Sequence, residues 1–505
     1  MSSPLIVDCH VHTRPVADYV VEGARLLDHM RGHGIAMMLA SDLGDGWPAF
    51  PDEATVRTAN ARLRDFVLRH PGEIAYLVYL NPQLAGWREE LARHCDSCRG
   101  VKLWVSLKDP ATGLLDHTLA VLREAARLDL TVLIHCLDRT DPNRGGEVDL
   151  EELIGLARAV PECRIVGAHA GGNWRKAIAL KEKVPDNLWF DISGSYPERT
   201  MVRRLADAFG AAKLLYGSDA PGRSFGSQLA KVLTEEFPPD EAAQILAENA
   251  RKLFRLDPEP RTRTSLPALD WQLPDLTEDH FCFAGEAPFW DHKISVGTLL
   301  AEMARNGVEL AYPVSLDAIC ASDRVAANRA WRELCRPHAA LCPLAAVDPR
   351  DRAEVLRQMD DMEGFAGLWI SPYLHGYPPD DPALDEFFRL CTARQLPLWL
   401  NTAVSDDRFR SPALVRHNVT PDELAARMRR SSEVRCCVQG LSGLAKWTRE
   451  AQGNWVFECS KLSDGEYLME EFADPGRGAP AHLVFGSEYP FRAMEQVVNV
   501  LTQVW

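Results

Sequence analysis

Short apolar runs alternate with amphipathic stretches through the first half of the chain. Continuous apolar runs predict buried strands, and apolar residues spaced three and four apart predict helices. The expected strands span residues 5–11, 35–40, 74–80, 100–105, 131–136, 164–168, 188–192 and 213–216, and helices are expected at 19–32, 52–70, 116–128, 150–160, 199–209 and 225–237. Eight such units in about 256 residues predict a parallel α/β fold closed as a (β/α)8 TIM-type barrel. An open doubly wound sheet usually carries a glycine-rich turn after its first strand, where this chain has histidines.

The pattern starts again after a polar, proline-rich stretch. Landmarks recur with an offset of 267 residues at three places and 269 at a fourth: 81–82 with 348–349, 100–101 with 367–368, 187–193 with 454–460, and 216–221 with 485–490. A repeat of this length predicts two tandem barrels, the second diverged from the first. We therefore expect a catalytic barrel at 1–256, a linker at 257–270 and a second barrel at 271–505.

Histidines stand at the ends of the expected strands. His10 and His12 alternate along strand one, so both side chains point to the same side. His135, His169 and Asp219 end strands five, six and eight, and side chains at these strand ends converge on the barrel mouth. Imidazoles with one carboxylate suit Zn²⁺ or a similar divalent metal with an open position for water. For the His10 and His12 pair alone, hydrogen-bonded core histidines are an equal alternative.

Lys102 lies inside the apolar run of strand four. An ammonium group is costly to bury, so this side chain must pair, lose its proton or be modified. It could form a carbamate that bridges two metals, or bind a substrate carboxylate as an ammonium group. The alternative is a lysine whose head group reaches the rim.

Cationic and aromatic residues populate the loops that follow the strands. The candidate substrate contacts are Arg14, Trp104, Arg139, Trp174 and Arg223, with Trp47, Arg144, Tyr196 and Arg199 nearby in sequence. Several arginines at the mouth of an acidic protein suggest a carboxylated, aromatic substrate. Ordinary salt bridges at the rim are the alternative for any single arginine.

Taken together, these residues resemble the metal-dependent amidohydrolase superfamily, and most closely its amidohydrolase 2 branch, which contains aminocarboxymuconate-semialdehyde decarboxylase. The likeness covers nearly all of residues 4–256, including segments 60–71, 167–172, 217–221 and 248–254. It implies that His10, His12, His135 and Asp219 bind Zn²⁺ or Mn²⁺, with His169 as a further ligand or a partner of the metal-bound water. Lys102 stands where phosphotriesterase-like members carry a carboxylated lysine, which implies one or two metals.

The expected second barrel lacks these groups. In register stand Phe281, Phe283, Trp369, Asn401, Gly440 and Glu488. One carboxylate without imidazoles cannot hold Zn²⁺ in this way, so the second barrel is predicted to be catalytically silent. Members of the branch commonly form dimers in which a neighbour reaches the active site. The resemblance therefore implies an intramolecular pseudo-dimer, with the whole chain a monomer or a homodimer.

The predicted activity is hydrolysis of an amide, ester or lactone bond in a small carboxylated substrate by metal-activated water. Asp219 would carry the proton, and His169 or the metal would polarise the carbonyl, with Lys102 completing the catalytic set. One alternative is nonoxidative decarboxylation, or hydration, of a small aromatic or unsaturated carboxylic acid. A non-catalytic metal-binding scaffold is the second alternative.

Composition limits the other classes of function. With 56 basic against 72 acidic residues the net charge is −16, which is the wrong sign for a general binder of nucleic acid or anionic membrane. Thirteen cysteines, an odd number, favour reduced thiols. The N-terminus lacks the pattern of a targeting signal, and no apolar run approaches the roughly 18 residues that span a bilayer. We expect a cytoplasmic protein with a small-molecule substrate.

Overall fold

The computed structural model of the chain divides into two compact units, residues 1–268 and 269–502. The division falls within the segment predicted as a linker. The residues that the structure describes are 4–14, 19–140, 143–194, 198, 200–264, 266, 273–288, 290, 292–404, 408, 416–444, 447, 453–468 and 482–502.

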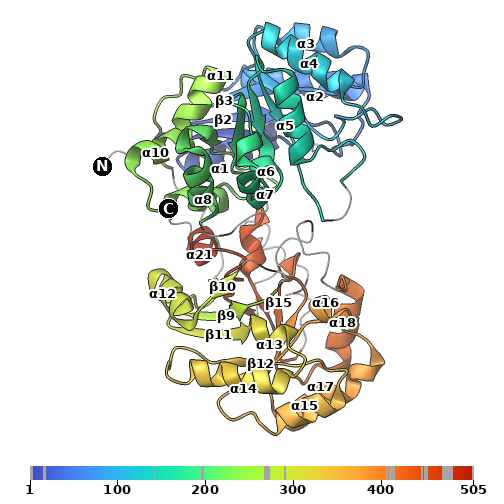
Figure 1. The fold of residues 1–505 in the computed structure, drawn as a ribbon, viewed down its shortest axis with the longest axis vertical. Coiled ribbons are helices and arrows are strands. Elements are labelled where there is room, and N and C mark those ends of the chain that lie inside the picture. Colours follow the sequence, from blue (N-terminus) through green and yellow to red (C-terminus); the bar gives the residue numbers. More distant parts are fainter. Residues whose placement is uncertain are drawn as a thin grey trace. The chain divides into compact units, whose positions relative to one another are not determined.

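The first unit is a closed barrel of parallel strands (Figure 1, blue to green). The strands are β1 (Val7–His12), β2 (Met37–Ser41), β3 (Ile74–Leu80), β4 (Gly100–Leu103), β5 (Thr131–Ile134), β6 (Ile165–Gly167), β7 (Leu188–Asp191) and β8 (Leu214–Leu215). They pair in chain order. The ring closes where the Cys9 amide donates to Tyr216 O at 3.1 Å and the His12 amide to Ala220 O at 2.7 Å. The predicted TIM-type barrel is confirmed.

Helices connect the strands and account for the continuous apolar runs, because parallel strands covered by helices are buried on both faces. They are α1 (Tyr19–Gly32), α2 (Glu53–Val67), α3 (Trp87–His94), α4 (Asp116–Arg127), α5 (Leu150–Ala159), α6 (Ala168–Gly171), α7 (Trp174–Ala179), α8 (Met201–Phe209), α9 (Phe225–Leu233), α10 (Pro239–Ala243) and α11 (Asn249–Phe254). Asp149 and Glu152 form a capping box that fixes the start of α5. Among the described residues, every helix is too short or too polar to cross a bilayer.

The second unit is a diverged barrel (Figure 1, yellow to red). Its strands are β9 (Glu278–Glu286), β10 (Lys293–Ile294), β11 (Leu310–Ser315), β12 (Leu344–Ala346), β13 (Gly367–Ile370), β14 (Leu398–Asn401), β15 (Cys436–Gln439), β16 (Trp455–Glu458) and β17 (Leu483–Val484). β9 pairs with β11 in a parallel ladder, and the Phe283 amide donates to Tyr489 O at 2.8 Å beside β17. The added β10 is antiparallel to the long β9, which is the main departure from the first barrel.

The described helices of this unit follow the same alternation. They are α12 (Val296–Asn306), α13 (Leu316–Cys320), α14 (Arg324–Cys335), α15 (Arg352–Met359), α16 (Pro372–His375), α17 (Asp385–Ala393), α18 (Pro421–Arg430) and α21 (Met494–Thr502). All thirteen cysteines of the chain are free thiols, as expected.

One buried amide performs the same task in each unit. Asn60 donates from Nδ2 to Tyr79 O at 2.9 Å and accepts from Tyr79 N at 2.8 Å. Asn328 pairs with Ala346 in the same two-bond arrangement, at 2.9 and 3.1 Å. Each asparagine thus satisfies the backbone of the third main barrel strand. This shared detail agrees with a repeat, although the tandem duplication itself stays a prediction.

Replacing Asn60 by alanine removes both bonds to Tyr79 and a third from Nδ2 to Glu90 Oε1 at 3.0 Å. We expect Asn60→Ala to lower the free energy of unfolding by about 3 kcal/mol, measured by urea denaturation. Asn418→Ala, at an exposed position, should change it by less than about 0.5 kcal/mol. Equal effects of the two substitutions would contradict the structural role of Asn60.

Candidate metal centre

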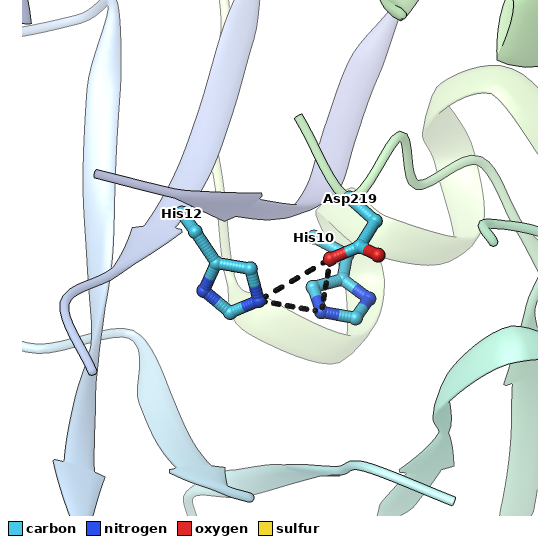
Figure 2. A group of neighbouring side chains, drawn as sticks. All are labelled: His10, His12 and Asp219. Carbon is cyan, nitrogen blue, oxygen red and sulfur yellow. Dashed lines mark hydrogen bonds and ion pairs between the residues drawn. The ribbon is translucent and has the colours of Figure 1, made fainter. Parts of the chain in front are cut away.

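Three side chains from the two ends of the first barrel's sequence meet at its mouth. Nε2 of His10 and Nε2 of His12 lie 3.2 Å apart. Asp219 follows β8, and its Oδ1 lies 3.7 Å from the first nitrogen and 3.4 Å from the second. Figure 2 shows the two rings and the carboxylate directed at one another. The structure therefore brings these three predicted residues together, and their role as metal ligands stays a prediction.

His169 and His135 extend this group. Nε2 of His169 lies 3.3 Å from Nδ1 of His135, and the rings of His10 and His169 are 5.2 Å apart between centroids. Ligand atoms of His10, His12 and Asp219 form a set within 4.8 Å, and His135 lies outside it, joined through His169. His169 sits in α6 with a positive φ of 57°, a conformation that costs a non-glycine residue about 1–3 kcal/mol.

A glycine makes room for the His169 ring. Gly194 has a φ of +98°, and a Cβ atom there would lie 2.8 Å from His169 Nδ1. A side chain at this position would both strain the backbone and displace the imidazole.

Asp191, at the end of β7, determines the protonation of two rings. Its Oδ2 accepts from His10 Nδ1 at 2.9 Å, and its Oδ1 accepts from the Ser193 hydroxyl at 2.5 Å and from the His169 amide at 3.0 Å. Since the Ser193 proton is given to Asp191, Ser193 Oγ accepts from His169 Nδ1 at 2.9 Å. Both Nδ1 atoms therefore carry the proton, and both Nε2 atoms carry a lone pair.

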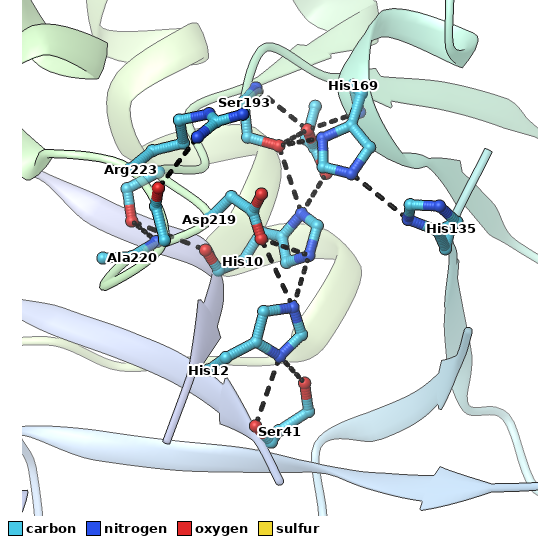
Figure 3. A network of polar contacts seen from close by, with 12 residues as sticks. His10, His12, Ser41, His135, His169, Ser193, Asp219, Ala220 and Arg223 are labelled. Carbon is cyan, nitrogen blue, oxygen red and sulfur yellow. Dashed lines mark hydrogen bonds and ion pairs between the residues drawn. The ribbon is translucent and has the colours of Figure 1, made fainter. Parts of the chain in front are cut away.

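The other two rings are fixed from outside the cluster. Nδ1 of His12 faces Ser41 Oγ at 2.9 Å and the Ser41 carbonyl oxygen at 3.3 Å. A carbonyl oxygen only accepts, so the proton lies on Nδ1 and Nε2 is free. Nε2 of His135 lies 3.2 Å from Glu147 Oε1, which assigns its proton to Nε2 and the lone pair to Nδ1. Figure 3 shows most of this network.

The pKa values agree with unprotonated rings. Burial lowers the pKa of His12 to about 4 and lowers the pKa values of His135 and His169. Burial alone would raise the pKa of Asp219, but the histidines around it favour its ionised form and hold the pKa well below its usual value. Several lone pairs and one ionised carboxylate thus face a common centre without a proton between them. This donor set fits a divalent cation of the Zn²⁺ or Mn²⁺ type.

Lys102, on β4, is fully buried within the same cluster. Its Nζ lies 2.7 Å from His10 Nε2, the atom that carries a lone pair. Burial lowers the pKa of this lysine to about 8, so the amine form is accessible near neutral pH. The prediction that Lys102 faces the site rather than the rim is consistent with this geometry.

Two tryptophans line one side of the cluster. The Trp47 ring lies 5.4 Å from the His12 ring and 6.4 Å from the Trp104 ring, and Trp104 lies 6.5 Å from the His135 ring, all between centroids. Trp104, a predicted substrate contact, therefore flanks the centre. The two indole rings are nearly perpendicular, at 77°, and an apolar wall of this kind suits the aromatic group of a substrate.

Two other predicted substrate contacts, Arg139 and Trp174, make close contacts with residues of the chain itself. Arg139 forms a bidentate ion pair with the buried Glu147. Trp174 is buried, and the guanidinium groups of Arg175 and Arg204 lie over its ring, 4.3 and 4.6 Å from the centroid. Internal contacts of this strength compete with binding of a ligand.

The two remaining arginines lie near the site. Arg223 follows Asp219 by one turn, with its amide donating to Asp219 O at 3.1 Å. Arg14 is partly buried just after β1. Arg144 contributes its backbone amide to Glu147, whereas Tyr196 and Arg199 lie outside the described residues. The role of Arg14 and Arg223 as substrate contacts stays a prediction.

Sequence reasoning missed the residues that hold the histidines. Asp191 could have been found, because it is a carboxylate at the end of a predicted barrel strand, like Asp219. Ser41, Ser193 and Glu147 gave no comparable signal, since loop positions and hydroxyl groups are too common to single out.

Comparison with known proteins agrees with this geometry. The sequence profile of the amidohydrolase family matches residues 7–256. The first unit belongs to the amidohydrolase family. This is a family of metal-dependent enzymes, and the histidine cluster of this unit lies within the matched residues. No curated protein matches the chain by sequence.

Several solved structures are similar to one half of the chain. They include 5-carboxyvanillate decarboxylase from Sphingomonas paucimobilis, at 16% identity and a TM-score of 0.40, covering 50% of this chain and 100% of that one. A dihydroxybenzoic acid decarboxylase from Polaromonas with bound manganese has 15% identity, a TM-score of 0.40, and coverage of 50% and 97%. 4-Oxalomesaconate hydratase from Rhodopseudomonas palustris has 16% identity, a TM-score of 0.39, and coverage of 50% and 96%.

The centre of the second barrel is built differently. Phe283 packs edge-on against Trp369, with ring centroids 6.2 Å apart, where the first barrel has His12 and Lys102. Glu488, the counterpart of Asp219, is ion-paired to Lys461 at 2.7 Å and to Arg492 at 3.3 Å. The carboxylate is therefore neutralised by cations of the chain itself.

The unprotonated histidines make stability depend on pH. His12 has a pKa of about 4 in the folded chain against an ordinary value of 6.5. Between these two pH values the unfolded chain therefore binds a proton at His12 that the folded chain does not. Stability of the metal-free protein therefore falls with decreasing pH, by about 1.4 kcal/mol per pH unit for each such group.

Between pH 7 and pH 5 the free energy of unfolding of the wild-type chain should fall. We expect His12→Gln to make this fall smaller by about 2 kcal/mol. Urea unfolding in the presence of a chelator measures it, and the wild-type chain at the same two pH values is the reference. An unchanged difference between pH 7 and pH 5 in the variant would show that His12 is not buried in the neutral form.

Proposed function

We propose that the first barrel is a metal-dependent hydrolase that cleaves an amide, ester or lactone bond of a small carboxylated molecule. The observation that carries the proposal is the convergence of His10, His12 and Asp219 with their unprotonated donor atoms facing one centre. His10, His12, His135 and Asp219 would hold the ion, with His169 adjacent. A divalent ion held there supplies Lewis acidity to a water molecule and to a substrate oxygen.

Asp219 is the residue best placed to move a proton. Its side chain is 25% exposed, whereas those of His10 and His12 are 1% and 4% exposed, so it is the most accessible of the three. An ionised carboxylate there accepts a proton from the attacking water and passes it to the leaving group. His169, with its Nε2 unprotonated, orients the substrate or the water by accepting a hydrogen bond, and Lys102 offers a cation or an amine beside His10.

Decarboxylation of a small aromatic acid is the second candidate. The Lys102 amine, 2.7 Å from His10 Nε2, would suit a substrate carboxylate if it is protonated, and Trp47 and Trp104 would suit an aromatic ring. Assays of the metal-loaded chain for ester and lactone cleavage and for CO₂ release from aromatic acids separate the two. Turnover of neither class in metal-loaded protein would favour the scaffold alternative.

The metal-binding proposal predicts different results for His12 and Asp219. Wild-type chain should bind at least one Zn²⁺ or Mn²⁺, and His12→Ala should lose both metal and activity. Asp219→Asn should lose activity, at least about 100-fold, while keeping most of the metal. Elemental analysis after gel filtration and turnover measure these outcomes.

Glu488→Gln in the second barrel is the matched control for Asp219→Asn. It should leave metal content and turnover at the wild-type level, because Glu488 is already neutralised by Lys461 and Arg492. Metal loss in Glu488→Gln would overturn the proposal that the second barrel is catalytically silent. The pseudo-dimer stays a prediction.

Lys102 determines whether one or two ions bind. As a neutral amine, its Nζ can attack CO₂ and lose one proton to form a carbamate, an anionic group that would offer oxygen ligands to one or two ions. We expect ¹³C-bicarbonate to give a carbamate NMR signal that Lys102→Met lacks, together with two equivalents of Zn²⁺. One equivalent and no carbamate signal would refute carboxylation and favour the decarboxylase.

A further inference from the structure

A single buried carboxylate organises the loop between β5 and α5. The Glu147 side chain is 1% exposed, and each of its oxygens accepts two bonds. Oε1 accepts from His135 Nε2 at 3.2 Å and from Arg139 Nη2 at 2.9 Å. Oε2 accepts from Arg139 Nε at 2.8 Å and from the Arg144 amide at 3.0 Å.

We propose that Glu147, held by Arg139, is the positioning residue that directs Nδ1 of His135 toward the metal centre. The inference rests on the proposed metal site. An ionised carboxylate can only accept, so the ring must place its proton on Nε2. Nδ1 then carries the lone pair, on the side of the ring where His169 Nε2 lies 3.3 Å away. His135 thus presents Nδ1, whereas His10 and His12 present Nε2.

Arg139 keeps this arrangement neutral overall. A buried carboxylate facing an imidazole could otherwise draw a second proton onto the ring and block the lone pair. The guanidinium group of Arg139 compensates the charge of Glu147 through two parallel bonds. Arg139 is therefore assigned to the histidine rather than to a substrate.

The loop is built to return Glu147 to the ring twelve residues earlier. Its two arms are joined by the Leu137 amide, which donates to Val148 O at 3.2 Å. Asn143 Nδ2 donates to Leu137 O at 2.6 Å, and the Arg139 amide donates to Asn143 Oδ1 at 3.1 Å. These bonds hold the loop around Arg139 and Glu147 without involving the His135 ring, so the two side chains can impose an orientation on that ring.

The test is Glu147→Gln in the full-length chain. An amide can donate as well as accept, so the ring loses its fixed tautomer at nearly constant volume. We expect the dissociation constant for Zn²⁺, measured by competition with a chromophoric chelator, to rise about 10- to 100-fold. The visible absorption bands of the Co²⁺-substituted protein should also change.

Glu354→Gln is the matched control. Glu354 is another buried carboxylate that accepts from an arginine, Arg324 Nη1 at 3.1 Å, and from a backbone amide, Asp348 N at 2.9 Å, but it touches no candidate ligand. It should lower stability to a similar extent and leave Zn²⁺ affinity and the Co²⁺ spectrum at wild-type values.

Wild-type affinity and an unchanged Co²⁺ spectrum in Glu147→Gln would overturn the assignment. Should that variant not fold, ¹⁵N NMR of zinc-loaded, histidine-labelled wild-type protein decides, with His135 identified by His135→Gln. A proton on Nε2 of His135 supports the assignment, and a proton on Nδ1 refutes it. Failure of the wild-type chain to bind Zn²⁺ would instead refute the proposed function.

Discussion

The centre of the first barrel depends on one constraint. Lone pairs of histidine nitrogens and of a carboxylate face one another there without a proton between them. Nε2 of His10 and of His12 lie 3.2 Å apart, with Asp219 Oδ1 within 3.7 Å of both. The partners behind the rings place each proton on the far nitrogen, so the near nitrogens repel one another and the carboxylate. A cation at the centre converts this repulsion into bonding.

The surrounding fold produces that geometry at the cost of backbone strain. Parallel strands bring residues from β1, β5, β6, β7 and β8 to one end of the barrel, as the fold requires. His169 and Asp219 both adopt positive φ values, 57° and 64°, which non-glycine residues rarely do. Gly194 leaves space for the His169 ring. Strain concentrated at these residues is typical of a functional site.

The second unit fills the corresponding positions without imidazoles. Glu458 stands where Asp191 stands and accepts from the Gly440 and Ser460 amides at 2.7 Å each, but no ring binds it. Burial raises the pKa of Glu458 to about 7, whereas the pKa of Asp191 is held well below its ordinary value by His10, His169 and Ser193 despite burial. The position of Gly194 is taken by Lys461, whose ammonium binds Glu488. An internal cation thus stands beside the carboxylate of the second barrel, where the first barrel is proposed to bind a metal ion.

The sequence predicted the barrel and the inner residues of the site because both follow from periodicity. Alternation along β1 places His10 and His12 on one side, and strand ends place His135, His169 and Asp219 near them. The positioning groups were not predictable in the same way. Ser193 and Glu147 lie in loops whose conformation no pattern of residue types specifies, and the pairing of Arg139 with Glu147 is visible only in the structure. Lys461 could be assigned a role only once the structure placed its ammonium group beside Glu488.

The proposed metal centre can be observed by anomalous diffraction from crystals of the full-length chain, collected at the absorption edge of the bound metal. We expect a peak enclosed by His10, His12 and Asp219, with Nδ1 of His135 directed at the same centre. An absent peak in metal-loaded crystals, or a peak among residues 269–502 alone, would contradict it.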